Sequence, residues 1–445
     1  MSPAPPGVPT GPPTAPPPPS PWPPSRSPEP SPSRRRPPPL PIAIAVVVVL
    51  AAGVAALVLT GDDGPGTDLA ADKAPSTTTE APPPTSAPPT TAEPLPPTTE
   101  PRTPLERAVV ELSAFVAQER GLEFLRPVQV ELLEDGPFEA RLLRDVEEER
   151  EAVDQSEKVL RALGLLEPGV DLFETYVSFY GGAVLGFYDP ETDELVLRGA
   201  ELNPYVRSTL VHELTHALDD QHFELHRPEL DEGDDEAAFA FSALVEGVGV
   251  TVETSYQQGL SADEQAEADQ EAAKFGGRID YSSVPPIVTS LVQFPYLGGP
   301  SFVSALVRHG GDAEVDAAFR NPPTTTEQIL YPEIYLAGDD PLSVPPPPAG
   351  GPIIEEGTYG QWILYLTLAD VLDGDAADRA ADGWGGDSYV AWDEGPSRTC
   401  VRMAFAMDTP NDLRELDDAW RQWARAHGDT TVDTTADTVT VTACG

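Results

Sequence analysis

Two proline-rich segments, 1–41 and 61–104, limit where this chain can form a folded core. The chain contains 53 prolines, and most of them precede residue 105. Segments of this composition carry too few apolar side chains to offset the conformational entropy that folding removes. We therefore expect both segments to be disordered, and the folded part to begin near Pro104 and to use the remaining ~340 residues.

Between these segments lies a run without a charged residue, 42–60. A helix over this run would span about 28 Å, close to the ~30 Å hydrocarbon core of a bilayer. A cleaved signal peptide fits less well, because its apolar core is shorter and lies nearer the N-terminus. The run follows three arginines and precedes acidic residues, a bias that places the N-terminus in the cytoplasm. We expect a single-pass protein of the cell membrane with a cytoplasmic tail (1–41), a transmembrane helix (42–60), a stalk (61–104) and an extracytoplasmic folded part.

The net charge of −47 restricts the possible partners. A strongly acidic surface repels the phosphate backbone of nucleic acids, so we expect no nucleic-acid partner. The excess of acidic residues is typical of a well-solvated surface on an exported protein. The sequence does not indicate an oligomeric state.

The two cysteines, Cys400 and Cys444, both lie near the C-terminus. In a cytosolic protein they would be ordinary thiols, whereas an oxidising compartment outside the membrane favours a disulfide. We expect them to be paired.

Hydrophobic periodicity predicts an α+β fold that is mainly helical. The pattern 183–199 predicts a β-hairpin, with its turn at Asp189 and Pro190, directly before a helix. We divide the folded part into a larger domain, 105–350, and a C-terminal α/β subdomain, 351–445. The expected helices are 105–120, 137–163, 204–223, 235–256, 358–372 and 409–426, and the expected C-terminal strands are 387–392, 398–406 and 437–443.

The segment His212-Glu213-Leu214-Thr215-His216 carries the chemistry. Histidines four residues apart lie on one face of a helix, so both imidazoles can bind one metal ion, and the intervening glutamate can reach a water beside that ion. Zinc lowers the pKa of a bound water, and a nearby carboxylate can take its proton. This pattern favours a site with one Zn²⁺ held by His212 and His216, with Glu213 as general base.

The third ligand is less constrained. Glu246 lies on an otherwise apolar face of the helix 235–256, where an unpaired carboxylate would be costly and a metal ion would be a suitable partner. Gly247 and Gly249 would let a neighbouring helix approach closely. His222, ten residues after His212, is the alternative ligand, although Asp219 stands where that arrangement needs a glycine turn. Glu236 and Glu253 are further alternatives.

Four segments together resemble the HEXXH zinc metallopeptidases, or zincins, of the gluzincin type, and more narrowly a family of bacterial exported metallopeptidases. They are HELTHALDDQHFEL, ALVEG, PPTTTEQILYPEIYLAGDDP and GWGGDSYVAW, and the resemblance covers most of 160–420. It implies a zincin-like domain with His212, His216 and Glu246 as ligands and Glu213 as base. The sequence departs from the family at Val248, where an aspartate is expected, so the groups that orient the ligands are altered.

We expect a membrane-anchored zinc metallopeptidase that cleaves peptide or protein substrates. A surface module that keeps the scaffold but only binds a partner is the alternative, and zinc-dependent hydrolysis of a non-peptide substrate is a third possibility. The oxyanion of such a reaction needs a hydrogen-bond donor. The candidates for that donor are Tyr296, His309, Tyr331 and Tyr335, whereas His226 and His427 have no expected role.

Overall fold

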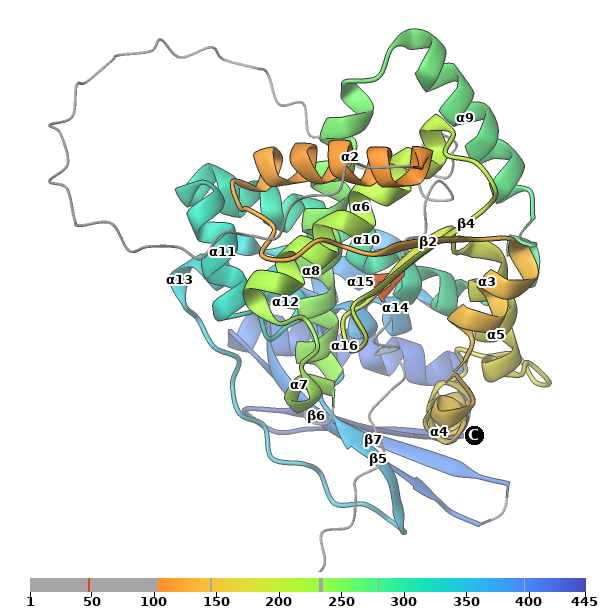
Figure 1. Ribbon diagram of the computed structural model, residues 1–445. Helices are drawn as coiled ribbons and strands as arrows, with labels where there is room; N and C mark the ends of the chain where they lie inside the picture. The colour runs from red at the N-terminus through yellow and green to blue at the C-terminus, as the bar shows by residue number, and fades with distance from the viewer. Residues whose placement is uncertain (1–46, 49–102, 145, 232–234, 279, 396) are drawn as a thin grey trace, which may run out of the picture. The chain divides into compact units, whose positions relative to one another are not determined.

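The computed structural model describes residues 47–48, 103–144, 146–231, 235–278, 280–395 and 397–445. This part of the chain has a mixed α/β fold that is mainly helical and contains two small sheets (Figure 1). It begins at Thr103, which caps the helix α2 (Pro104–Arg120) through a capping box with Glu106. The expected start of the folded part near Pro104 agrees with this cap.

The first sheet has the strand order β1-β3-β4-β2. The hairpin expected within 183–199 is present as β3 (Gly186–Asp189) and β4 (Glu194–Arg198), paired antiparallel. β2 (Val130–Leu133) adds parallel to β4, and the two residues of β1 (Val47–Val48) lie antiparallel to the outer edge of β3.

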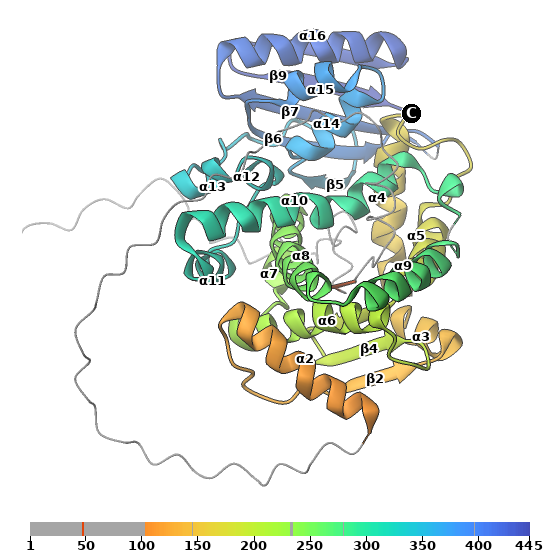
Figure 2. The same ribbon diagram turned by 90° about the horizontal axis from the view of Figure 1, so that it is seen from above.

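Helices make up most of the region up to residue 337, and α8 (Asp235–Gln258) is central among them. It packs against both α6 (Pro204–Phe223) and α10 (Pro286–Gly310) (Figure 2). The α8–α10 crossing is very close, because a Cβ on Gly247 would lie 2.4 Å from the backbone of Gly299. The remaining helices here are α3 (Asp135–Leu142), α4 (Arg150–Ala162), α5 (Leu172–Ala183), α7 (Pro228–Asp231), α9 (Ala262–Gly276), α11 (Asp312–Arg320), α12 (Thr326–Leu330) and α13 (Pro332–Ala337), with 3₁₀ turns at Val146–Glu149 and Tyr281–Ser283.

The C-terminal part is a five-stranded antiparallel sheet of order β5-β6-β7-β9-β8. The aromatic residues Trp420 and Trp423 of α16 are fully buried against it. Asp387, in the glycine-rich start of β6, accepts hydrogen bonds from the backbone of Tyr359 and Gly360, so that segment has a structural role. The elements are β5 (Ile353–Gly357), α14 (Gln361–Ala369), α15 (Gly374–Ala381), β6 (Trp384–Asp393), β7 (Thr399–Met407), α16 (Pro410–Ala426), β8 (Thr430–Thr434) and β9 (Val439–Cys444).

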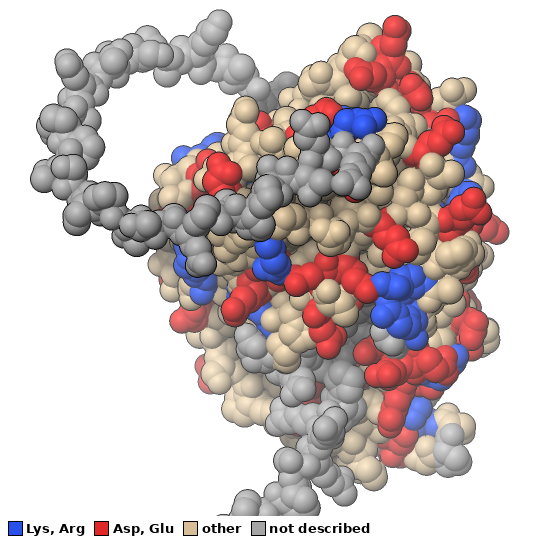
Figure 3. Space-filling model, in the orientation of Figure 1, with Lys and Arg blue, Asp and Glu red and all other residues tan. Residues whose placement is uncertain are grey.

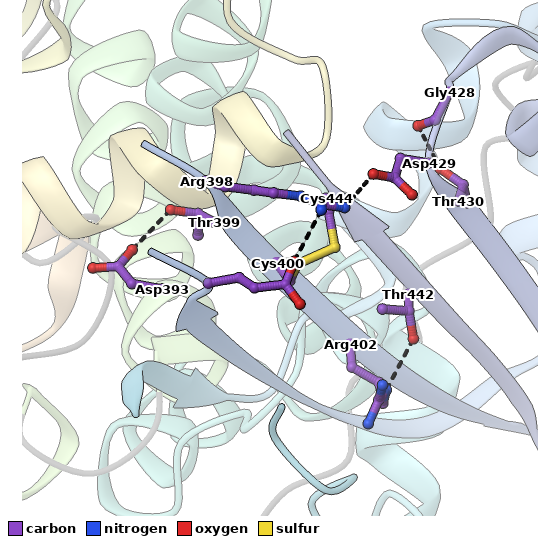
Figure 4. Close-up of a disulfide and its surroundings, with 11 residues drawn as sticks. Asp393, Arg398, Thr399, Cys400, Arg402, Gly428, Asp429, Thr430, Thr442 and Cys444 are labelled. Carbon is purple, nitrogen blue, oxygen red and sulfur yellow. Dashed lines mark hydrogen bonds and ion pairs between the residues drawn. A yellow bond between two sulfur atoms is a disulfide. The ribbon is translucent and has the colours of Figure 1, made fainter. Parts of the chain in front are cut away.

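Cys400 and Cys444 form the expected disulfide (Figure 4). They lie directly opposite each other on β7 and β9, with Cα atoms 4.1 Å apart. This is less than the 5–6 Å typical of disulfides, because the flanking pair Thr399 and Gly445 makes the two hydrogen bonds and leaves the cysteines at the narrow, non-hydrogen-bonded position.

The helix expected over 137–163 is wrong as a single element. The chain instead forms α3, a 3₁₀ turn and α4. Arg141 and Arg144 bind Glu194 of β4 and fix the end of α3 to the sheet, while Glu147, Glu148 and Glu149 place three like charges in the turn. Tertiary ion pairs therefore override the local helical pattern.

The expected tail 1–41 and almost all of the stalk 61–104 lie outside the described residues. Of the expected span 42–60, only Val47 and Val48 are described, and they form the strand β1 where a helix was expected. The remainder of the span lies outside the described residues, so the membrane anchor stays a prediction. Among the described residues, Glu236–Gln258 is long and apolar enough to cross a membrane, but 67% of its most apolar stretch is buried, as in the core helix of a folded domain.

Candidate metal centre

The helix α6 holds His212, Glu213 and His216, which are all fully buried. The helix begins with Pro204 after Asn203, whose side chain accepts a hydrogen bond from the backbone of Val206. Proline in the first turn and asparagine at the cap are both typical of a helix start. The four-residue spacing places the two imidazoles on one face, with ring centroids 4.5 Å apart.

Glu246 of α8 completes a group of three side chains that could hold a metal ion. Its Oε2 lies 3.1 Å from Nε2 of His212 and 3.6 Å from Nε2 of His216. One ligand atom from each residue lies within 4.8 Å of the others, and all three residues are buried. The structure thus brings together the three residues that the sequence nominated.

Several buried polar atoms at this site lack protein partners. Both carboxylate oxygens of Glu213 and both ring nitrogens of His216 are without a hydrogen bond. Buried polar groups are normally satisfied, and leaving one unsatisfied costs ~1–3 kcal/mol. A cation between the three side chains would bind Nε2 of His216, and a water beside that cation would reach the carboxylate of Glu213, so the residues present fit a metal ion.

The electrostatics of the three side chains are coupled. Burial alone would lower the pKa of His212, but Glu246 and Glu253 raise it to about 10. Burial and the charge on His212 lower the pKa of His216 to about 4. Burial would raise the pKa of Glu246, yet its contacts with the two histidines lower it. Without a metal, Glu246 therefore favours its ionised form and His216 its neutral form, both of which bind metal, whereas His212 favours its protonated form and would release a proton as a metal binds.

Glu213 lies beside this group without belonging to it. Burial raises its pKa well above the usual value. A Cβ added to Gly186 of β3 would come within 3.2 Å of Glu213 Oε1, so the strand passes directly over the carboxylate. A raised pKa suits a group that must accept a proton and then release it.

The two histidines leave no room for a side chain at position 249, which is a glycine. A Cβ there would lie 2.6 Å from Nε2 of His212 and 2.9 Å from Cε1 of His216. The other expected glycine, Gly247, contacts α10 instead. Both glycines therefore permit close approach, one to the site and one to the neighbouring helix.

Glu253, two turns after Glu246 on α8, contacts the opposite nitrogen of His212. Its Oε2 lies 3.1 Å from Nδ1, and its Oε1 accepts a hydrogen bond from Gln257. Because a carboxylate only accepts, Nδ1 donates to Glu253, and it would keep this proton if a metal replaced the proton of Nε2 between His212 and Glu246. Seven residues are two helical turns, so Glu253 and Glu246 lie on the same face of α8 and both can contact His212. This spacing is the sequence signal for a carboxylate that orients the ring. Val248, at the position of the missing aspartate, is buried among apolar residues.

The alternative ligands lie elsewhere. α6 continues without a break to Phe223, so His222 stays on another face of the helix, and its Nε2 contacts the backbone carbonyl of Glu123. Glu236 accepts hydrogen bonds from the backbone and hydroxyl of Thr326.

Of the candidate oxyanion donors, the structure places Tyr296 near the metal group and the other three elsewhere. Tyr296 on α10 interacts electrostatically with Glu246 and Glu213, and burial followed by these charges raises its pKa. Tyr180 on α5, which the sequence analysis missed, also interacts with Glu246. Tyr335 donates instead to the carbonyl of Asn321, Tyr331 interacts with Asp382, and His309 is exposed.

Comparisons with known proteins match only parts of this chain. Residues 352–444 match a family model described as a domain of unknown function (DUF8575), which corresponds closely to the expected C-terminal subdomain. No curated protein matches. A solved structure described as "a putative hydrolase with a novel fold from Chloroflexus aurantiacus" is 17% identical; the match covers 53% of this chain and 89% of that one, with a TM-score of 0.33.

Proposed function

We propose that this chain is a zinc metallopeptidase with a zincin-like domain. The observation that carries the proposal is the meeting of His212, His216 and Glu246 beside the unpartnered carboxylate of Glu213. Two imidazoles and one carboxylate are the ligand set of many catalytic zinc sites. A carboxylate that is buried next to the ligands, but outside their group, is suited to act as a general base.

In the proposed reaction, a bound zinc ion would supply Lewis acidity, which polarises a carbonyl and lowers the pKa of water toward ~7. Glu213 accepts a proton from the attacking water as the new carbon–oxygen bond forms. It then gives this proton to the amide nitrogen as the carbon–nitrogen bond breaks. Tyr296 donates a hydrogen bond to the developing oxyanion. The products are a carboxylic acid and an amine, and Glu213 ends the reaction in its ionised form, as it began.

A peptide substrate is favoured by β3. The outer edge of this strand, where β1 pairs antiparallel, starts at Gly186, which lies against Glu213. An extended peptide that took the place of β1 along this edge would place its backbone next to the metal group. We also propose that the domain works outside the membrane, where an oxidising compartment would maintain the disulfide between Cys400 and Cys444.

The test compares two variants of the full chain. Glu213→Gln should keep stoichiometric zinc and lose hydrolysis of an unfolded protein substrate by about 10²–10⁴-fold, because it removes only the proton acceptor. His212→Ala should lose both zinc and activity. If the wild-type protein binds zinc but cleaves nothing in a broad peptide library, the chain is a metal-stabilised binding module and the peptidase proposal fails. Cleavage of an ester but of no peptide would instead favour a non-peptide substrate.

A further inference from the structure

A second cavity lies at the start of α6, and none of the proposed ligands lines it. It has a volume of about 370 Å³ and is lined by the ends of β4 and α9 and by the first turn of α6. Its apolar wall includes Leu185, Val206 and Phe275, and its polar wall includes Arg198, Lys274 and Arg278. Cationic residues are scarce in this chain, which has 27 of them against 74 acidic residues, and acidic side chains are spread over the face drawn in Figure 3.

Arg198 is the buried cation of this cavity. It is 4% exposed, its guanidinium stacks over the ring of Phe138, and Nη2 donates to the carbonyl of Gly181. Its Nε is buried and has no hydrogen-bond partner. The carboxylate of Asp135 lies 3.8 Å from Nε, which is too far for a hydrogen bond.

Arg120 is as deeply buried as Arg198 but is hydrogen-bonded to carboxylates. It is also 4% exposed, but it makes three hydrogen bonds to Asp219 and one to Asp316. Burial lowers the pKa of both arginines; the two aspartates more than compensate at Arg120, whereas the pKa of Arg198 stays below its usual value. A buried charge without a full partner is expensive, so Arg198 lacks an acceptor that a ligand could supply.

The other charges around the cavity largely pair with one another. Arg278 makes two hydrogen bonds to Asp135, and Lys274 binds Glu271. Three carboxylates also line the cavity, those of Asp135, Glu201 and Glu271, and they would repel an anion. A dianion would have only one incompletely paired cation, Arg198, to offset this repulsion. A monoanion matches the charge of Arg198 alone, and the first turn of the long helix α6 adds a favourable field.

We propose that this cavity binds a carboxylate attached to an apolar group, with the guanidinium of Arg198 as the cation that the carboxylate approaches and Leu185, Val206 and Phe275 around the apolar group. Such a carboxylate could belong to a small organic acid or to the C-terminus of a peptide that ends in an apolar residue. The site is independent of the metal centre and does not rest on the proposed peptidase activity.

The test uses the full chain and two pairs of probes. N-acetyl-leucine should bind, whereas N-acetyl-leucine amide should not, when binding is measured by calorimetric titration. A peptide that ends in free leucine, compared with its C-terminal amide, distinguishes the second source: tighter binding of the free peptide than of N-acetyl-leucine assigns the site to chain ends, and equal binding assigns it to small acids. In the variant Arg198→Gln, affinity for N-acetyl-leucine should fall about tenfold or more.

Two further variants keep the test decisive if Arg198→Gln does not fold. Ala200→Phe should fill the mouth of the cavity and abolish binding without removing a charge. Arg144→Gln, at an exposed arginine outside the cavity, should bind as the wild type does. The His212→Ala variant should also retain binding, and loss there would assign the probe to the metal centre. Equal binding of acid and amide, or full binding by Ala200→Phe, would overturn the proposal.

Discussion

The imidazole of His212 is held between two glutamates of one helix. Nδ1 lies 3.1 Å from Glu253, and Nε2 lies 3.1 Å from Glu246. Glu253 therefore fixes the ring orientation from the side opposite to the proposed metal. This contact is consistent with a site that keeps a ligand-orienting carboxylate although Val248 replaces the expected aspartate.

Glu253→Gln should weaken metal binding or activity by about 10–100-fold, because an amide is a poorer acceptor and orients His212 less well. The measurement is zinc affinity by competition with a chelator, together with the pH dependence of hydrolysis. Glu267→Gln, at an exposed glutamate of α9, is the matched control and should change neither. Unchanged zinc affinity and an unchanged pH profile in Glu253→Gln would show that Glu253 is merely a neighbour.

Gly249→Ala should displace the histidines, because the new Cβ would lie 2.6 Å from Nε2 of His212. We expect zinc affinity to fall about tenfold or more, since a ligand set tolerates only ~0.5 Å of displacement. The control is Gly276→Ala in α9, where a Cβ meets nothing within 4 Å. That change should leave the zinc affinity intact. Zinc binding by Gly249→Ala at wild-type strength would contradict the close packing of α8 on the histidines.

A buried glutamate in the C-terminal sheet predicts a pH dependence of stability. Glu355 is 7% exposed and accepts hydrogen bonds from Tyr389 and Ser156. Burial raises its pKa to about 7, although the two hydrogen bonds oppose this shift. Between pH ~4.5 and ~7 the folded state therefore holds a proton that the unfolded state has released, so this group's contribution to stability falls as the pH rises through that window.

Glu355→Gln should remove this dependence. At pH 8 the variant should be more stable than the wild type by at most on the order of 3 kcal/mol, and at pH 4 the two should be similar. Chemical denaturation at several pH values measures the difference. Glu356→Gln, at an exposed neighbour, should follow the wild-type curve. A wild type that gains stability from pH 5 to pH 7 relative to Glu355→Gln would reverse the predicted sign.

The disulfide should stabilise the C-terminal sheet. Cys400 and Cys444 are 44 residues apart, and a closed loop of this size contributes about 4 kcal/mol in the chain-entropy model. The double substitution to serine should lower Tm, and a reductant should lower the Tm of the wild type to a similar value while leaving the variant unchanged. A wild type that is insensitive to reductant under unfolding conditions would contradict this contribution.

The sequence predicted the helices that carry the site better than the remainder of the fold. α6 and α8 end within about two residues of the expected positions although both are buried on most sides and have little amphipathic periodicity. Asn203 and Pro204 mark the start of α6, and α8 is a long apolar run. Glu246 could be nominated because a carboxylate on an apolar face needs a partner. The sequence suggested Glu253 only as a possible ligand. Which nitrogen of His212 it contacts depends on how α6 and α8 pack, and the sequence does not give that packing.

Elements that depend on distant partners were missed. β2 becomes a strand through parallel pairing with β4, more than sixty residues away, and the threonine-rich β8 pairs with β9 although its sequence resembles a loop. The expected helix 137–163 was interrupted by ion pairs to Glu194 that no local pattern reveals. Long-range contacts of this kind are invisible to periodicity.

The four hydrogen bonds of Arg120 have a consequence for how such an enzyme could be regulated. They tie α2 to Asp219, one turn after His216, and to Asp316, while Leu112 and Val116 of α2 are buried in the core. α2 is therefore an integral part of the domain that carries the metal group, unlike a removable propeptide. Loss of α2 would leave Asp219 as an uncompensated buried charge on the helix that carries the two histidines, so a protein without α2 should lose stability and zinc binding. Latency, if the protein has any, would have to come from something other than the removal of α2.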